Sequence, residues 1–360
     1  MRYLNRRFVL GAGGGLMVFP ARAAARRIVT LAGTGLQGSA GDGEAVNTAR
    51  LDQPYGVLIG PDGALTWADF GSNRVLKLKA RKISVVAGNG AKGHAGDGGQ
   101  AAQAELSAPH EVRFDSKRNM LIAERDAHVV RLVDRNSGRI STLAGTGAPG
   151  FSGDSGPSAQ AQLKQPHSIA LDGRDNLYIC DIQNNRIRRR DAASGILATF
   201  AGNGETGDTP DEAPLSAPLH GPRSIDIAPD GTLYLILREG NKVYSIDPAR
   251  KIMKRVAGTG AKGYGGDGGP ARDSTWSGPK GIAYAPDHSL YISDTENHVI
   301  RRVSLTDGTV STVAGTGKRG DGPDGDPLQC ALARPHGVCV HDGTLYIGDS
   351  ENHRIRALTL

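Results

Sequence analysis

The sequence predicts an all-β fold, a closed ring of six similar units, on three observations. A proline recurs every 55 to 57 residues, at Pro54, Pro109, Pro166, Pro222, Pro279 and Pro335. An Ala-Gly-x-Gly signature recurs at the same interval, beginning at Ala32, Ala87, Ala144, Ala201, Ala257 and Ala314. No apolar stripe of helical period is visible between them. A long period with four short strands per unit is typical of a six-bladed β-propeller with four-stranded antiparallel blades.

Residues 281–314 show why each unit has four strands. Residues 281–284 form the first strand, and residues 290–293 are a short apolar run that forms the second. Residues 294–297 are a turn cluster, after which residues 299–303 alternate as a third strand. Residues 306–308 make a tight turn into a β-branched run, 310–314, which stops at Gly315. The other units are divergent repeats of this pattern.

The two ends of the chain predict how the ring closes. The sixth unit has its first three strands but no outer strand before Leu360. Residues 28–32, which precede the first Ala-Gly-x-Gly signature, have the outer-strand pattern. We therefore expect this N-terminal strand to pair into the last blade, which would remove the exposed edges of an open array. Residues 26–360 are expected to be one domain.

Residues 1–25 have the pattern of a targeting segment. Arg6 and Arg7 precede a glycine-rich apolar stretch, and small residues follow Pro20. The segment looks like a bacterial twin-arginine signal peptide, and the stretch is short of the roughly 20 residues that span a bilayer. We expect a periplasmic or secreted protein with no stable membrane anchor.

Charge and cysteine content narrow the functional classes. The formal net charge is +6, and loss of residues 1–25, with four arginines and no acidic residue, leaves +2. So small a charge gives no electrostatic case for nucleic acid. Of the three cysteines, only Cys330 and Cys339 are close enough in sequence to suggest a disulfide, and buried thiols are the favoured interpretation.

A connector of about 20 residues, rich in Asp and Gly, precedes each proline. Its repeated aspartates lack the every-second-residue spacing of an EF-hand calcium loop. We expect each of them to cap a short helical turn. They are Asp42, Asp97, Asp154, Asp208, Asp267 and Asp321.

The repeats resemble a known family. The pattern Pro-x-(Gly/Ser)-Ile-Ala, then Gly-x-Leu-Tyr-Ile-x-Asp-x-x-Asn-His-x-Ile-Arg, is best seen in residues 166–188, 279–301 and 335–356. It resembles the NHL repeat over about residues 28–360. The resemblance implies a propeller whose relatives include lyases, ligand sensors, and protein or RNA binders. His128, His298 and His353 fall on the turn after the second strand, where we expect structural roles.

The residue after each proline should stand at the mouth of the central channel, one from each blade. Around the ring these residues are Tyr55, His110, His167, Arg223, Lys280 and His336. Stability alone does not require such a polar set. The residue ending each second strand is expected to reach the same rim: Asp69, Glu124, Asp181, Leu237, Asp294 and Asp349. Glu124 departs from the aspartate pattern and is a further catalytic candidate beside Tyr55, Arg223 and Lys280.

One chemical interpretation is a divalent metal, zinc or calcium, at the mouth. His110, His167 and His336 would be its ligands, as in a three-ligand catalytic zinc site, with Arg223 or Lys280 holding an anionic substrate group. The segments at 165–171 and 334–349 look like the Pro-His segments that carry zinc-binding histidines in peptidyl-α-hydroxyglycine α-amidating lyase. That resemblance implies His167 and His336 as ligands, although the histidines of that family are spaced two blades apart.

Two other interpretations stay open. Gluconolactonase-like propellers hydrolyse substrates with a channel metal held by carboxylate and amide oxygens, a role for Glu124, Asp181, Asp294 and Asp349. For the aspartates, structural hydrogen bonds to backbone amides in the adjoining turn are the favoured interpretation. Alternatively, the chain is a non-catalytic propeller that binds a small molecule, peptide or protein. We lean towards a metal-dependent lyase or hydrolase acting on a small polar substrate.

Overall fold

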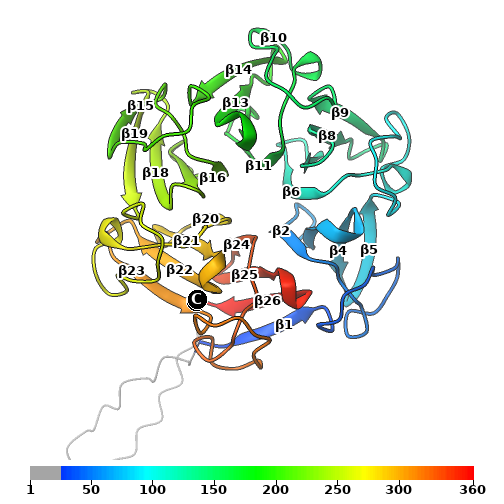
Figure 1. Ribbon diagram of the computed structural model, residues 1–360. Helices are drawn as coiled ribbons and strands as arrows, with labels where there is room; N and C mark the ends of the chain where they lie inside the picture. The colour runs from blue at the N-terminus through cyan, green and yellow to red at the C-terminus, as the bar shows by residue number, and fades with distance from the viewer. Residues whose placement is uncertain (1–25) are drawn as a thin grey trace, which may run out of the picture.

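The computed structural model describes residues 26–360, and they form a ring of six antiparallel sheets around a central channel (Figure 1). This confirms the predicted six-bladed β-propeller. The predicted targeting segment, residues 1–25, lies outside the described residues. Within residues 26–360, no helix is long and apolar enough to cross a membrane.

Each blade has four strands, numbered here from the channel outwards. Blade 1 contains β2 (Pro54–Ile59), β3 (Leu65–Asp69), β4 (Arg74–Lys79) and β5 (Lys82–Ala87). Blade 2 contains β6 (Pro109–Phe114), β7 (Met120–Glu124), β8 (Val129–Val133) and β9 (Ile140–Ala144). Blade 3 contains β11 (Pro166–Leu171), β12 (Leu177–Asp181), β13 (Arg186–Arg190) and β14 (Ile196–Ala201), with β10 (Gly156–Pro157) at its edge.

The second half of the ring repeats the arrangement. Blade 4 contains β16 (Pro222–Ile227), β17 (Leu233–Leu237), β18 (Lys242–Asp247) and β19 (Ile252–Ala257), with β15 (Glu212–Pro214) at its edge. Blade 5 contains β20 (Ile282–Ala285), β21 (Ser289–Asp294), β22 (Val299–Ser304) and β23 (Val310–Ala314). Blade 6 contains β24 (Val338–His341), β25 (Thr344–Asp349), β26 (Arg354–Thr359) and β1 (Ile28–Ala32).

The ring closes as predicted, through the N-terminal strand. β1 pairs antiparallel with β26, placing Ile28 opposite Leu358 and Thr30 opposite Arg356, and the two lie side by side at the bottom of Figure 1. Asp324 reinforces the closure, because it accepts hydrogen bonds from the backbone N–H (3.0 Å) and hydroxyl (2.8 Å) of Thr30. The ends of the described chain are therefore held in one sheet.

Seven short 3-10 helices complete the secondary structure of residues 26–360. Four follow a second strand: η1 (Phe70–Ser72), η4 (Ile182–Asn184), η6 (Thr295–Asn297) and η7 (Ser350–Asn352). The other three lie in connectors: η2 (Ala101–Gln103), η3 (Ser158–Gln160) and η5 (Ala271–Asp273). The hydrophobic core lies between neighbouring blades; one cluster joins Ile236 of blade 4 to Leu290 and Ile292 of blade 5.

The connector aspartates do not cap helices, which corrects the sequence prediction. Helices η2, η3 and η5 have no side-chain cap. Asp267 instead forms an ion pair with Arg301 of the third strand (2.7 Å) and accepts the backbone N–H of Thr312 on the outer strand (2.9 Å). Asp97, Asp154 and Asp321 pair likewise with Arg131, Arg188 and Arg356. Each of these four aspartates thus ties its connector to a blade through an ion pair. Asp208 pairs with Lys242 (2.6 Å), and Asp42 accepts the backbone N–H of Val85 (3.2 Å).

The turn after each second strand joins one blade to the next. His298 has a left-handed backbone (φ 58°), and its Nδ1 accepts the backbone N–H of Arg334, the residue before Pro335 (3.1 Å). His128 accepts from Gln165 in the same way (3.1 Å), and His353 from Gln53 (3.3 Å). Asn73 and Asn241 take this role in blades 1 and 4. The three histidines are structural, as predicted.

The three cysteines carry free thiols. Cys180 and Cys330 are buried in separate hydrophobic clusters, and Cys339 is partly buried. Cys330 and Cys339 therefore do not pair, and buried thiols were the interpretation favoured by the sequence.

His298→Asn should leave stability nearly unchanged, because asparagine performs the same role at Asn73 and Asn241. His298→Ala should lower the free energy of unfolding by about 1–3 kcal/mol, since the N–H of Arg334 loses its acceptor and alanine disfavours a left-handed backbone. Chemical denaturation of both variants checks this. Equal losses in the two variants would contradict the role assigned to this side chain.

Candidate functional site

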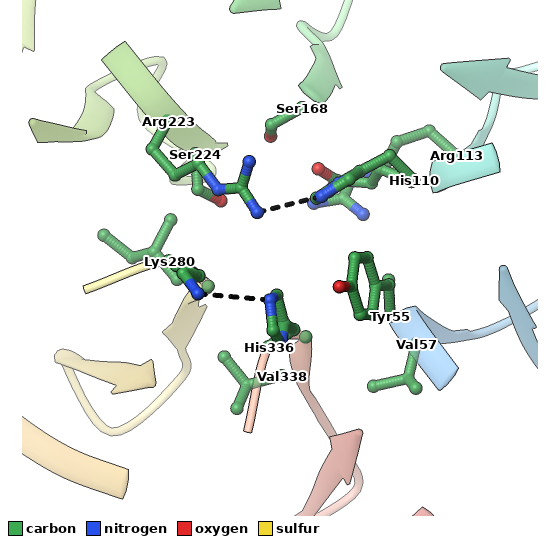
Figure 2. A pocket seen from close by; sticks show the side chains of 15 residues that line it. Tyr55, Val57, His110, Arg113, Ser168, Arg223, Ser224, Lys280, His336 and Val338 are labelled. Atoms are coloured by element: carbon green, nitrogen blue, oxygen red, sulfur yellow. Dashed lines mark hydrogen bonds and ion pairs between the residues drawn. The ribbon is translucent and has the colours of Figure 1, made fainter. Parts of the chain in front are cut away.

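The six residues that follow the prolines surround one end of the channel, called here the upper end, as the sequence predicts. All are buried, with exposed fractions between 5% and 9%: Tyr55, His110, His167, Arg223, Lys280 and His336. All but His167 line a common cavity (Figure 2). In blades 5 and 6 these residues precede the innermost strand, yet the N–H groups of Lys280 and His336 still bond to the second strand. We call these six residues the mouth cluster.

Aromatic contacts hold one side of the mouth cluster together. Tyr55 stacks on His336, with ring centroids 3.9 Å apart, and meets His110 edge-on at 4.9 Å. His167 meets His110 edge-on at 4.6 Å. Phe70, at the start of η1, stacks on the other face of Tyr55 at 4.3 Å. The four rings of Tyr55 and the three histidines thus form a continuous wall from blade 6 to blade 3.

Two cations occupy the opposite side and point at the histidines (Figure 2). The Arg223 Nη2 donates to His110 Nε2 at 2.9 Å, and the Lys280 Nζ donates to His336 Nε2 at 3.3 Å. Lys280 also forms an ion pair with Glu296 at 3.0 Å. The Nε2 lone pairs of two imidazoles are therefore occupied by hydrogen-bond donors.

Backbone carbonyl oxygens fix the tautomers of His336 and His167. The Nδ1 of His336 lies 2.9 Å from the carbonyl oxygen of Arg334, and the Nδ1 of His167 lies 2.7 Å from that of Gln165. A carbonyl oxygen only accepts, so Nδ1 carries the proton in both rings. Each ring then presents an unprotonated Nε2.

Burial and neighbouring positive charge disfavour the charged forms of the basic residues in the mouth cluster. Burial, followed by the charge of Arg223, lowers the pKa of His110 well below its usual value, and burial and Lys280 do the same for His336. Burial and the neighbouring Arg223 lower the pKa of Lys280 to about 7. Burial lowers the pKa of Arg223 to about 9. His110 and His336 are therefore neutral near pH 7, so Arg223 and Lys280 supply the positive charge on their side of the mouth.

The carboxylates that end the second strands do not reach the mouth, which corrects the sequence prediction. Glu124 is fully buried within its blade, where it accepts the N–H of Ser107 (2.7 Å) and pairs with Arg131 (3.3 Å). The aspartates of this position accept the N–H of the equivalent connector residue: Asp69, Asp181, Asp294 and Asp349. One oxygen of each acid accepts a backbone N–H and the other bonds to a side chain, as Glu124 does with Arg131. Glu124 therefore has a structural role in this geometry, and the aspartates form the structural hydrogen bonds that the sequence favoured.

The mouth cluster does not fit the predicted metal site. Across residues 26–360, no three His, Cys, Asp or Glu side chains are placed to hold one metal ion. The Nε2 atoms of His110 and His336 face a guanidinium and an ammonium group, and cations at these lone pairs oppose a divalent metal. The metal site stays a prediction that this geometry does not favour.

The sequence interpretation missed a second tier of residues above the mouth cluster. Phe70 covers Tyr55, and Arg125 lies over the Phe70 ring at 4.8 Å from its centroid. Glu296 joins Lys280 to Arg334, whose Nε and Nη2 bond to its carboxylate at 2.9 and 2.8 Å. Phe70 and Arg125 occupy one repeat position, directly after the acid. The residue at this position differs from blade to blade, and that variation could have identified Phe70 and Arg125 from the sequence.

Close contact between innermost strands narrows the channel just below the mouth cluster. The next residue along five of these strands is Gly or Ser: Gly56, Ser168, Ser224, Gly281 and Gly337. A Cβ on Gly337 would lie 2.3 Å from the carbonyl oxygen of Tyr55, and one on Gly281 would lie 2.0 Å from that of His336. Only glycine allows blades 5, 6 and 1 to approach this closely. The cavity at this level is about 20 Å³, room for one water molecule.

Comparison with known families identifies the repeat. Residues 332–358 match the NHL repeat family. The match covers blade 6 of the six-bladed propeller, which therefore contains an NHL repeat.

Curated relatives share the repeat region only. The chain is 26% identical over 273 residues to "Protein SUPPRESSOR OF QUENCHING 1, chloroplastic" of Arabidopsis thaliana, covering 73% of this chain and 26% of the relative. It is 26% identical over 286 residues to "NHL repeat-containing protein 2" of Bos taurus, covering 70% of this chain and 39% of the relative. The chain thus spans less than half the length of these relatives.

Solved structures share the fold at low identity. An auxiliary nutrient binding protein from Bacteroides thetaiotaomicron aligns with a TM-score of 0.68 and 18% identity, over 92% of this chain and 76% of that one. A virginiamycin B lyase from Staphylococcus aureus, a catalytically inactive histidine-to-alanine variant with quinupristin, aligns with a TM-score of 0.53 and 16% identity, over 85% and 80%. A gluconolactonase from Xanthomonas campestris aligns with a TM-score of 0.59 and 13% identity, over 93% and 90%. One architecture thus serves binding proteins, lyases and hydrolases.

The burial of Asp69 predicts a pH-dependent stability. Asp69 has no arginine partner, and burial raises its pKa to about 7. The folded state therefore binds the proton more tightly than the unfolded chain, and this stabilisation is lost as pH rises through 7. Between about pH 4 and 7, the wild type should lose stability relative to Asp69→Asn, by at most about 1.4 kcal/mol per pH unit.

Chemical denaturation at a series of pH values measures this difference. Asparagine retains the oxygen that accepts the N–H of Asp52, so the variant should fold. Parallel pH profiles for the two proteins would contradict the raised pKa of Asp69.

Proposed function

We propose that this protein is an exported propeller that binds a small molecule through an anionic group, a carboxylate, phosphate or sulfate, at the channel mouth. Arg223 and Lys280 hold the anion, and the neutral imidazoles with Tyr55 form the wall against which it rests. The proposal of export rests on residues 1–25 of the sequence, and that of the ligand rests on the mouth cluster.

The guanidinium of Arg223 carries this proposal. It is 6% exposed and, within the part of the chain that the structure describes, forms no ion pair with a carboxylate. Its hydrogen bond goes to a neutral imidazole, and its Nε is buried with no partner. A buried charge without a counter-charge is costly, and an oxyanion at the mouth would offset that cost with charge-assisted hydrogen bonds.

The dimensions of the channel restrict how such a ligand binds. Beneath the mouth there is room for about one water molecule, so only an oxygen-sized group enters. The body of the ligand would lie above the ring, near Phe70, Arg125 and Arg334. A ligand with a terminal oxyanion and a polar body fits this arrangement, and a peptide carboxylate is one such group.

Arg223→Gln should weaken binding of sulfate or succinate at least about tenfold, since a charge-assisted hydrogen bond contributes about 1.5–3 kcal/mol. Titration calorimetry at fixed ionic strength measures the affinity. Arg174→Gln, which removes an exposed arginine, should bind as the wild type does. If no oxyanion binds the wild type, or if both variants bind equally, the proposal is wrong.

Lys280 should make anion binding pH-dependent. Its pKa of about 7 means that the ammonium is lost as pH rises through neutrality, so sulfate affinity should fall between about pH 6 and pH 8. Sulfate keeps its charge over this range, and His110 and His336 are already neutral. In Lys280→Gln the affinity should be lower and nearly independent of pH; a variant with the wild-type pH profile would contradict this role for Lys280.

A lyase is the second candidate function, favoured by the contact between Lys280 and His336. An unprotonated Lys280 could accept a proton from carbon next to a carboxylate held by Arg223. The C–H electron pair would form a double bond, and the leaving group would depart with its own pair and take a proton from the Tyr55 hydroxyl. Burial raises the pKa of Tyr55, which keeps that hydroxyl protonated. This chemistry uses the residues of the mouth as they lie and no metal.

Metal-dependent lyase or hydrolase chemistry, predicted from the three histidines, requires a different arrangement of the same cluster. Elemental analysis of the purified protein, compared with a variant carrying His110→Ala, His167→Ala and His336→Ala, tests it. The geometry predicts that neither protein holds a stoichiometric divalent metal. One equivalent of zinc in the wild type, lost in the variant, would show that Arg223 and Lys280 move aside for a metal.

A further inference from the structure

The other end of the channel holds a second, larger cavity. The innermost strands that begin at the mouth cluster end at this cavity, which has a volume of about 770 Å³. Val57, Arg113, Ile282 and Val338 line both this cavity and the narrow one beneath the mouth. The two openings therefore lie at opposite ends of one channel. We call the larger one the lower pocket.

The walls of the lower pocket are apolar and aromatic. They include Ile227, Leu305 and Val340, each partly exposed. Tyr234 and Tyr284 stack with centroids 5.9 Å apart and an angle of 12° between their planes. A volume of this size with apolar walls and a few polar groups is typical of a small-molecule site.

The charges of the lower pocket are opposite to those of the mouth. Arg113 is the one arginine or lysine among the described lining residues, which also include the exposed His288, and it pairs with Glu111 deeper in the channel. Asp226 lines the pocket beside Arg113 and accepts the N–H of Tyr284 at 2.8 Å. Asp230 is exposed at the rim. Glu111 and Asp226 thus lie near one guanidinium, and the exposed Asp230 adds a third carboxylate at the rim, so the formal charge of this end of the channel is negative.

This surplus negative charge selects the ligand. Burial raises the pKa of Asp226 and of Glu111, and a cation beside them would favour their charged forms. The faces of Tyr234 and Tyr284 also attract cations. An apolar neutral molecule would satisfy the walls but not the carboxylates, and an anion would be repelled.

We propose that the lower pocket binds a small organic amine, a planar apolar body that packs between the tyrosines and aliphatic walls, with an ammonium group directed at Asp226. This site is separate from the mouth cluster and does not depend on the function proposed above. The channel thus accepts an anion at one end and a cation at the other, and the glycine constriction keeps the two ligands apart.

A panel of three indoles of matched shape tests the ligand class on the wild-type protein. Tryptamine carries an ammonium, 3-methylindole is neutral and indole-3-acetate carries a carboxylate. Titration calorimetry should rank tryptamine first, at least roughly tenfold tighter than 3-methylindole, with indole-3-acetate weakest at the lower pocket. The proposal is overturned if tryptamine does not bind, or if the neutral indole binds equally well.

Variants locate the binding. Asp226→Asn keeps an acceptor for the Tyr284 N–H and should weaken tryptamine binding roughly tenfold while leaving 3-methylindole unchanged. Glu205→Gln, an exposed carboxylate outside the pocket, should bind tryptamine as the wild type does. If Asp226→Asn fails to fold, Asp230→Asn at the exposed rim replaces it, with a smaller loss in the same direction. Wild-type affinity in both pocket variants would place tryptamine elsewhere and refute the site.

Discussion

The arrangement of the ring depends on the residue that precedes each proline. Gln53, Ala108, Gln165 and Arg334 all have left-handed backbones, with φ between 45° and 55°, a conformation that costs roughly 1–2 kcal/mol for residues other than glycine. In each case a His or Asn of the preceding blade accepts the residue's N–H. Such hydrogen bonds contribute about 1 kcal/mol each, which offsets the conformational cost and fixes the blade spacing. The residue after the proline is thereby directed into the channel.

The electrostatic character of the channel follows from that spacing. Glycines at the constriction bring the strands so close that the mouth residues are almost entirely buried. In this low-dielectric environment, the charges of Arg223 and Lys280 act on neighbouring imidazoles much more strongly than they would in water. His110 and His336 become neutral acceptors, and positive charge concentrates on the side of Arg223 and Lys280. At the lower pocket, Glu111 and Asp226 outnumber Arg113, so the channel carries opposite charges at its ends.

The sequence predicted the fold and the mouth cluster because both repeat with the period of the blades. Pro335 and its counterparts begin or shortly precede each innermost strand, and the residue after each proline takes an equivalent position in every blade. The acid that ends the second strand also repeats, yet it does not reach the rim. Asp294 and Glu124 instead accept the connector N–H two residues before the proline. A repeated acid is compatible with either position, so the spacing alone could not decide between them.

Contacts between side chains of different blades were the hardest features to predict from the sequence. Nothing in the spacing of Arg223 and His110, 113 residues apart, indicates that they meet across the channel. The metal site predicted from the three histidines therefore took no account of Arg223 and Lys280, which donate to the Nε2 atoms of two of them. The lower pocket was also not predicted. Asp226 and Tyr284 belong to positions that are variable or hydrophobic in other blades, and Tyr234 occupies the repeated tyrosine position of the second strand, which does not indicate a pocket.

The central claim is that Arg223 and Lys280 hold an anion at the channel mouth. Crystals soaked in selenate, measured at the selenium absorption edge, test it most directly because the anion's position is read from its anomalous scattering. The account predicts one selenate within hydrogen-bonding distance of the Arg223 guanidinium and the Lys280 Nζ. A mouth without selenate, and with a divalent metal bound instead to His110, His167 and His336, would contradict it.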